Sequence, residues 1–310
     1  MDAGSAETQH EESTIPWSRR QPKQAAVVYV LAYVLVAVAG GWITGQIAPS
    51  IILAFAITVV AALVLLFSVL VVLSICRLQL GVVGEVLAVV VLLAVFALVR
   101  PSVFAFAGRW VGAPEAGLHL ARMIPALPGQ FLLGNVVLIV WAAFLGRLVS
   151  RIIREGKLLL PVTVVAAIVD IFTVFWGVVA HVQEKAPEVA EAFSASAPVE
   201  VPEGVWAPIL AAVGIGDFLF LSVFLAVTIR FTMRPVKTMW AAYAVMLVAP
   251  LAFSIIPSTT GLPGLPFLAV AALWANRGHF SYTKEEKRAL GFTSLLVAAV
   301  AVGLWMALHR

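Results

Sequence analysis

Two aspartates lie inside long apolar segments of this sequence. Asp170 is in the run PVTVVAAIVDIFTVFWGVV, and Asp217 is in WAPILAAVGIGDFLFLSVFLAV. Neither has a lysine or arginine within two helical turns along the chain. A charged side chain at bilayer depth is costly, and one that is present usually faces the interior of a helix bundle and serves a function. The two aspartates are therefore the first candidates for chemistry, and the chemistry that carboxyl groups offer is proton transfer.

The two aspartates are expected on consecutive antiparallel helices, where they can face each other. Gly214 and Gly216 precede the second one and allow close backbone approach or local unwinding. Two carboxylates a few ångströms apart cannot both ionise easily, so they share a proton and titrate as a pair. The ionised member can deprotonate a water while the protonated member polarises a peptide carbonyl. The alternative is an interhelical hydrogen bond that only fixes packing.

Other reactive side chains are few. Glu85 lies within one or two turns of the end of its apolar segment, where it is expected to reach water near Arg77 and to have a structural role. Cys76 is the only cysteine, and His181 and His279 have no metal-ligand neighbour at helical spacing. We therefore expect no metal site and no cofactor.

The composition indicates which kind of secondary structure must position these side chains. The 310 residues are 62% hydrophobic and 12% charged, whereas a soluble domain is about 25% charged. Because a helix needs roughly 20 apolar residues to cross a bilayer, the sequence predicts an all-α, polytopic transmembrane helix bundle. A disordered cytoplasmic tail, 1–24, precedes a single transmembrane domain, 25–310. The nine predicted spans are 25–46, 50–76, 81–99, 130–149, 158–182, 207–231, 239–257, 262–276 and 290–308. Residues 100–127 are interpreted as a loop or an interfacial piece.

The basic residues predict the orientation of the bundle, because short cytoplasmic loops carry an excess of lysine and arginine. They cluster before span one and after spans two, four, six and eight, whereas the loop at 183–206 is acidic. The N-terminus is therefore predicted to be cytoplasmic and the C-terminus outside, in the cell membrane if the source is prokaryotic. The loop with Arg100, Arg109 and Arg122 is the exception. Scattered basic residues do not predict nucleic-acid binding; the run 284–288 predicts contact with the lipid bilayer.

The segment GIGDFLFLSVFLA, 214–226, resembles the GxGD segment of the presenilins and signal peptide peptidases. These intramembrane aspartyl proteases carry their first catalytic aspartate on the preceding helix, which corresponds to Asp170. They carry a Pro-Ala-Leu motif two helices after the GxGD helix, and Pro263, Gly264, Leu265 and Pro266 stand there. The resemblance covers about 155–280. It implies a presenilin-like fold, catalysis by Asp170 and Asp217, a cleft shaped by 214–216 and 263–266, and transmembrane helical peptides or proteins as substrates.

Some features depart from that family. Val169 stands where the family commonly has tyrosine, and Gly264 replaces the alanine of the Pro-Ala-Leu motif. A literal Pro-Ala-Leu-Pro occurs at 125–128 but precedes both aspartates, so 263–266 is taken as the counterpart. The chain also continues into a span at 290–308 and lacks one earlier span. The predicted outside loop resembles the signal peptide peptidase orientation, which favours substrates whose N-terminus is inside.

Two other functions stay open at this point. Intramembrane aspartates with helices broken by glycine and proline also occur in ion- or proton-coupled transporters. That hypothesis predicts a second broken helix in an inverted repeat, and the glycine- and proline-rich features all lie in the C-terminal half. The departures at Val169 and Gly264 also fit a catalytically inactive, presenilin-like binding protein. The sequence does not identify any accessory subunit.

Overall fold

The protein is built from α-helices that are apolar enough for a membrane. The computed structural model describes residues 21–47, 51–124, 129–176, 193–195, 213–253 and 263–308. Five helical segments in these ranges have the length and hydropathy to cross a bilayer: Pro22–Gly45, Ile51–Cys76, Val82–Val99, Gln130–Ser150 and Gly156–Val174. The prediction of an all-α, multi-pass integral membrane protein is confirmed at this level.

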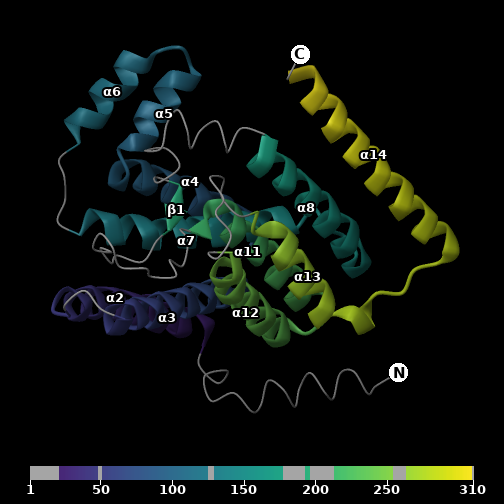
Figure 1. The fold of residues 1–310 in the computed structure, drawn as a ribbon, viewed down its shortest axis with the longest axis horizontal. Helices are drawn as coiled ribbons and strands as arrows, with labels where there is room; N and C mark the ends of the chain where they lie inside the picture. Colours follow the sequence, from purple (N-terminus) through teal and green to yellow (C-terminus); the bar gives the residue numbers. More distant parts are fainter. Residues whose placement is uncertain are drawn as a thin grey trace.

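The described residues contain eleven α-helices and one small sheet (Figure 1). The helices are α2 Pro22–Gly45, α3 Ile51–Cys76, α4 Val82–Val99, α5 Ser102–Trp110, α6 Pro114–Met123, α7 Gln130–Ser150, α8 Leu159–Trp176, α11 Ile215–Arg230, α12 Pro235–Phe253, α13 Leu265–Ala275 and α14 Lys284–Leu308. The two-stranded sheet pairs β1 Ser194–Ala195 with β2 Val213–Gly214 in antiparallel register. Short 3₁₀ turns, η2 Gly156–Leu158 and η3 Arg277–His279, precede α8 and follow α13.

A helix overlaps each of the nine predicted spans, but within the described residues only five helical segments have the length and hydropathy of a complete span. One prediction is wrong. The segment 207–231 is not a continuous helix, because 213–214 are extended in β2 and α11 begins at Ile215. The starts of α2 and α13 carry a proline at the first or second helical position, where the missing N–H costs no helical hydrogen bond.

The region between α4 and α7 forms a short helical hairpin instead of a plain loop. Helices α5 and α6 pack against each other through Gly108 and Gly117, where a side chain on either glycine would collide with the backbone of the other helix or of the turn. Gly112 in the turn has a φ of 74°, a conformation that favours glycine. At nine and ten residues, each helix is about 15 Å or less in length and is too short to cross a bilayer alone.

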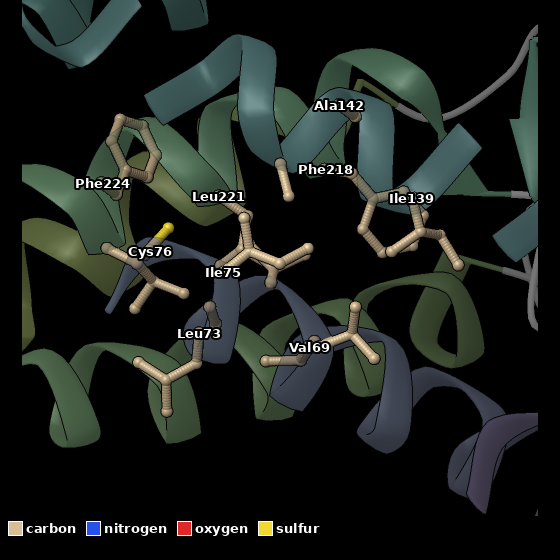
Figure 2. Close-up of a cluster of buried hydrophobic side chains, with 14 of the residues drawn as sticks. Val69, Leu73, Ile75, Cys76, Ile139, Ala142, Phe218, Leu221 and Phe224 are labelled. Atoms are coloured by element: carbon tan, nitrogen blue, oxygen red, sulfur yellow. The ribbon is translucent and has the colours of Figure 1, made fainter. Parts of the chain in front are cut away.

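The core lies where α3, α7 and α11 meet (Figure 2). Val69 and Ile75 of α3, Ile139 of α7, and Phe218 and Leu221 of α11 are among its buried side chains. Gly146 lets α7 approach α11 so closely that a Cβ there would overlap the Leu219 carbonyl oxygen. The hydroxyl of Ser222 donates to the Ala143 carbonyl oxygen at 2.6 Å. This contact fixes α11 by both packing and hydrogen bonding.

Basic residues gather where α7, α11 and α13 end and where α8, α12 and α14 begin. We call this part of the molecule the basic end, and it contains Arg147, Arg151, Arg154, Lys157, Arg230, Arg234, Lys237, Arg277, Lys284, Lys287 and Arg288. Contacts join these helix ends directly. The Arg230 side chain donates to the Ile153 carbonyl oxygen at 3.3 Å, and the Lys157 ammonium pairs with Glu286 at 2.8 Å.

The prediction for Glu85 is wrong in its partner and its exposure. Glu85 is fully buried and forms ion pairs with Arg147 at 2.6 Å and with Arg151 at 2.5 Å. Arg147 also donates to the Ile75 carbonyl oxygen at 2.7 Å. The carboxylate therefore does not reach water near Arg77; it joins α4 to the end of α7, which supports the structural role that the sequence predicted.

Arg100, one of the basic residues that depart from the charge pattern, is also buried. Its guanidinium donates to the Asn135 side-chain oxygen at 2.7 Å and lies 5.0 Å from the centre of the Phe131 ring. Asn135 is itself fully buried. This arginine therefore ties the end of α4 to α7, which gives its presence in the predicted outside loop a structural reason.

Candidate functional site

Asp170 lies near the middle of α8 and is partly exposed. Its carboxylate accepts a hydrogen bond from the backbone N–H of Leu265 at 3.0 Å. Leu265 is the first residue of α13, and the N–H groups of a helix start have no partner within their own helix. Asp170 thus caps a different helix, and this contact ties α8 to α13.

Asp217 lies in the first turn of α11 instead of at its middle. Its carboxylate turns back toward Gly214, the residue that precedes the helix, so that a Cβ on Gly214 would lie 3.7 Å from Asp217 Oδ2. An acidic side chain in the first turn is favoured by the positive end of the helix dipole. The next residue, Phe218, is 1% exposed in the core between α3 and α7, so the position of Asp217 is set by a well-packed helix.

The two carboxylates converge on the backbone where α13 begins. Asp170 contacts the N–H of Leu265, and Asp217 lies so close to Gly264 that a Cβ on this glycine would overlap its carboxylate. The aspartates are also near enough to repel each other electrostatically. Residues far apart in the sequence are thus brought together at Gly264 and Leu265, and we call Asp170, Asp217, Gly264 and Leu265 the aspartate site.

Helix lengths give the depth of the aspartate site from the basic end. At 1.5 Å per residue, Asp170 is about 16 Å from the start of α8, and Asp217 is about 20 Å from the end of α11. Helix α13 has 11 residues and runs about 16 Å from Leu265 to its end at Ala275. A hydrocarbon core is about 30 Å thick, so these lengths correspond to a position near the middle of a bilayer.

No cation neutralises the aspartate site within the part of the chain that the structure describes, because no lysine, arginine or histidine there forms an ion pair with either aspartate. The same residues contain no group of three or more histidine, cysteine, aspartate or glutamate side chains that could hold a metal ion. Two carboxylates without a cation favour a state in which one of them keeps a proton. Such a pair can act as a general acid and a general base.

The other predicted site residues have distinct surroundings. Gly214 precedes α11, and Pro263 is buried directly before Gly264. A Cβ on Gly216 would have nothing within 4 Å, so packing does not require a glycine there. Val169 is 48% exposed and lies on α8 beside Asp170. Pro266 follows Leu265 in the first turn of α13 and brings no N–H that would compete for Asp170. The second Pro-Ala-Leu-Pro, 125–128, lies outside the described residues.

A short piece of the predicted outside loop lies beside the aspartate site, which the sequence did not predict. Strand β1 pairs with β2, and the N–H of Ile215 donates to the Phe193 carbonyl oxygen at 3.0 Å. The Phe193 ring packs against Phe96 of α4, with ring centres 5.7 Å apart. The rest of the loop lies outside the described residues. No alternation of apolar and polar residues marks 193–195 as a strand, so the sequence carried no signal for this pairing.

Comparison with known proteins found no similar protein. The sequence matches no protein-family model, and the chain matches no curated protein and no solved structure. The function of the aspartate site therefore has to follow from its own geometry.

Proposed function

We propose that this protein is an intramembrane aspartyl protease that hydrolyses peptide bonds within transmembrane helices of membrane-protein substrates. The observation that carries the proposal is the convergence of Asp170 and Asp217 on the start of α13, without a neutralising cation among the described residues. A purely structural pair would need only to hydrogen-bond across helices. Here the two acids share one location at about the depth of the bilayer centre, where a substrate helix would pass.

The proposed reaction needs only the two carboxyl groups and water. The ionised aspartate takes a proton from a water molecule, whose oxygen attacks the carbonyl carbon of the scissile peptide bond. The protonated aspartate donates a hydrogen bond to the carbonyl oxygen and stabilises the tetrahedral intermediate. The proton taken from water then passes to the departing amine as the carbon–nitrogen bond breaks. The products are a carboxylic acid and an amine, and the aspartate pair returns to its starting state.

The backbone around the aspartates supports access by an unwound substrate. A peptide bond in a helix is shielded by its own hydrogen bonds, so a substrate helix must open locally before hydrolysis. Gly264 has no side chain beside Asp217, which leaves the α13 backbone open to the carboxylate. Both α11 and α13 begin next to the aspartates, and the positive ends of their dipoles favour negative charge there. These features suit an ionised carboxylate and a developing oxyanion.

The proposal includes a presenilin-like bundle of about nine spans, with the N-terminus cytoplasmic and the loop between the aspartates outside. It is supported by the helix at each predicted span and by the gathering of basic residues at one end. Because α5 and α6 are each too short to cross, the hairpin between α4 and α7 leaves the predicted orientation unchanged. In this orientation, substrates whose N-terminus is cytoplasmic are favoured.

A proton- or ion-coupled transporter is the second candidate, and one observation favours it. Helices α11 and α13 both begin at the aspartate site, and β2 directly before α11 is extended. Discontinuous helices that meet near the middle of the membrane form the ion sites of many transporters. The aspartates would then carry protons or coordinate a cation instead of activating water.

Cleavage of model transmembrane peptides by the purified protein in liposomes separates these functions. The wild type, Asp170→Asn and Asp217→Asn are compared on peptides of both orientations, with product identified by mass spectrometry. The protease proposal expects product from the wild type and none from either variant. If none of the three folded proteins cleaves but proton-driven uptake is lost in the variants, the transporter function replaces it. Peptide binding without cleavage or transport would indicate an inactive binding protein.

A further inference from the structure

An exposed tryptophan at the basic end lies between two cations. Trp274, in the last turn of α13, is 52% exposed. The Lys237 ammonium lies 5.0 Å from the centre of its ring, and the Arg277 guanidinium carbon lies 6.0 Å from it. Trp240, on the next turn of α12 after Lys237, is 41% exposed. We call Lys237, Trp240, Trp274 and Arg277 the Trp274 cluster.

A buried hydrogen-bond network fixes the backbone that carries the Trp274 cluster. Asn276 is fully buried, and its amide group donates to the Thr238 hydroxyl at 2.7 Å and to the Ala272 carbonyl oxygen at 2.8 Å. Its side-chain oxygen accepts from the Arg234 backbone N–H at 3.0 Å. The end of α13 is thus tied to the start of α12. Trp274 and Arg277 therefore sit on backbone whose position relative to Lys237 is set before any ligand binds.

The positive charge of the Trp274 cluster is not balanced by a carboxylate. Across the described ranges, neither Lys237 nor Arg277 forms an ion pair with an acidic side chain, whereas Lys157 at the same end is paired with both Glu155 and Glu286. Interaction with the ring face attracts each cation, but two like charges on one ring repel each other. An anion placed between them removes that repulsion, so the arrangement favours a negatively charged ligand.

The location and the apolar neighbour indicate what carries the negative charge. Helix α12 begins and α13 ends at this level, where the headgroups of a bilayer would lie, and tryptophan is enriched at that interface. Val270 precedes Trp274 by one helical turn, on the same face of α13, and is 66% exposed. A ligand that contacts both the cations around Trp274 and the exposed Val270 side chain has an anionic headgroup and an acyl chain. We propose that the Trp274 cluster binds the phosphate headgroup of an anionic phospholipid, with a chain lying along Val270. This site is independent of the proposed protease activity.

Lipid titration followed by native mass spectrometry tests this site on the full chain in detergent. Phosphatidylglycerol and phosphatidylcholine with identical acyl chains are compared. The wild type should bind phosphatidylglycerol more tightly, and Lys237→Gln/Arg277→Gln should lower that affinity by about thirtyfold. The matched control is Lys284→Gln/Lys287→Gln, which removes the same charge from the same end and should keep the wild-type affinity. The charge-retaining variant Lys237→Arg/Arg277→Lys should also bind, which separates lost recognition from lost folding.

Three outcomes would overturn the proposal. Equal binding of the two lipids by the wild type would show that the cluster does not recognise negative charge. Equal loss in the Lys237/Arg277 and Lys284/Lys287 variants would attribute the effect to net charge alone. Displacement of the lipid by millimolar inorganic phosphate or glycerol phosphate would assign the cluster to a soluble phosphate instead of a phospholipid. Weaker lipid binding by Trp274→Leu, with both cations retained, would support the role of the indole.

Discussion

Acidic side chains of the described helices have different surroundings at the basic end and at the aspartate site. At the basic end, the fully buried Glu85 lies between Arg147 and Arg151. At the aspartate site, Asp170 and Asp217 have each other and the helix starts of α11 and α13, with no cation among the described residues. A carboxylate held by two guanidinium groups fastens helices together, whereas two carboxylates without a cation favour a state in which one of them keeps a proton. The comparison separates an acid that holds the fold from acids that are available for chemistry.

The largest expected effect is on catalysis at the aspartate site. Asp170→Asn or Asp217→Asn should each lower the rate of peptide hydrolysis by about a thousandfold or more, because the acid or the base is removed. An amide oxygen in place of the Asp170 carboxylate can still accept the hydrogen bond from the Leu265 N–H, so thermal unfolding should change little. The double variant should be no slower than either single one, because the two residues act as a unit. Rate losses that multiply in the double variant would contradict a shared role.

The reverse pattern is expected at Glu85. Glu85→Gln should lower the free energy of unfolding by about 3–5 kcal/mol, because it leaves Arg147 with a buried, uncompensated charge. Hydrolysis per folded molecule should remain at the wild-type rate. Denaturant unfolding in detergent measures the first quantity and active-site titration the second. Glu155→Gln is the matched control: Glu155 is 58% exposed in its pair with Lys157, and its loss should cost about 0.5 kcal/mol or less. Equal losses of unfolding free energy in Glu85→Gln and Glu155→Gln would contradict a special structural role for the buried Glu85.

Two glycines beside the aspartates give a test of geometry. Gly264→Ala should lower hydrolysis on the order of a hundredfold, because a Cβ there overlaps the Asp217 carboxylate and must displace it. Gly216→Ala should leave activity near the wild-type rate, because nothing lies within 4 Å of the added methyl group. Peptide cleavage by both variants, with circular dichroism to establish folding, makes the comparison. Full hydrolytic activity of Gly264→Ala would contradict a catalytic position of the Asp217 carboxylate beside Gly264.

The smallest expected effect is at an exposed ion pair of the basic end. The Lys157 ammonium lowers the pKa of Glu286 below its ordinary 4.5. The stabilisation from this pair is therefore complete above pH 4.5 and is lost as the pH falls through the lowered pKa of the folded state. Glu286→Gln should lower the melting temperature by at most about 2 °C at neutral pH, and the difference should shrink toward zero as the pH falls through the lowered pKa of Glu286. A difference that persists in acid would have another cause.

Much of the architecture was accessible from the sequence because it depends on local composition. The apolar runs predicted segments that each overlap an observed helix, although α2 and α12 begin at Pro22 and Pro235, a few residues before the predicted starts at 25 and 239. The prediction of a continuous helix over 207–231 was wrong, because the apolar run around Asp217 does not reveal that 213–214 pair with 194–195. Apolar residues in a helix and in a buried strand look alike, and only the long-range hydrogen bonds distinguish them. The same limit applied to Glu85, whose partners lie more than sixty residues away in the sequence.

The sequence by itself determined that this is a multi-pass membrane protein, because the free energy of burying apolar side chains in lipid depends on their number and not on their partners. It also singled out Asp170 and Asp217, since an acid without a nearby cation stands out in an apolar run. The tertiary structure decided that both approach Gly264 and Leu265, that Gly264 must lack a side chain there, and that Glu85 is held by two arginines. These are contacts between helices, and their geometry follows from packing that no single segment encodes.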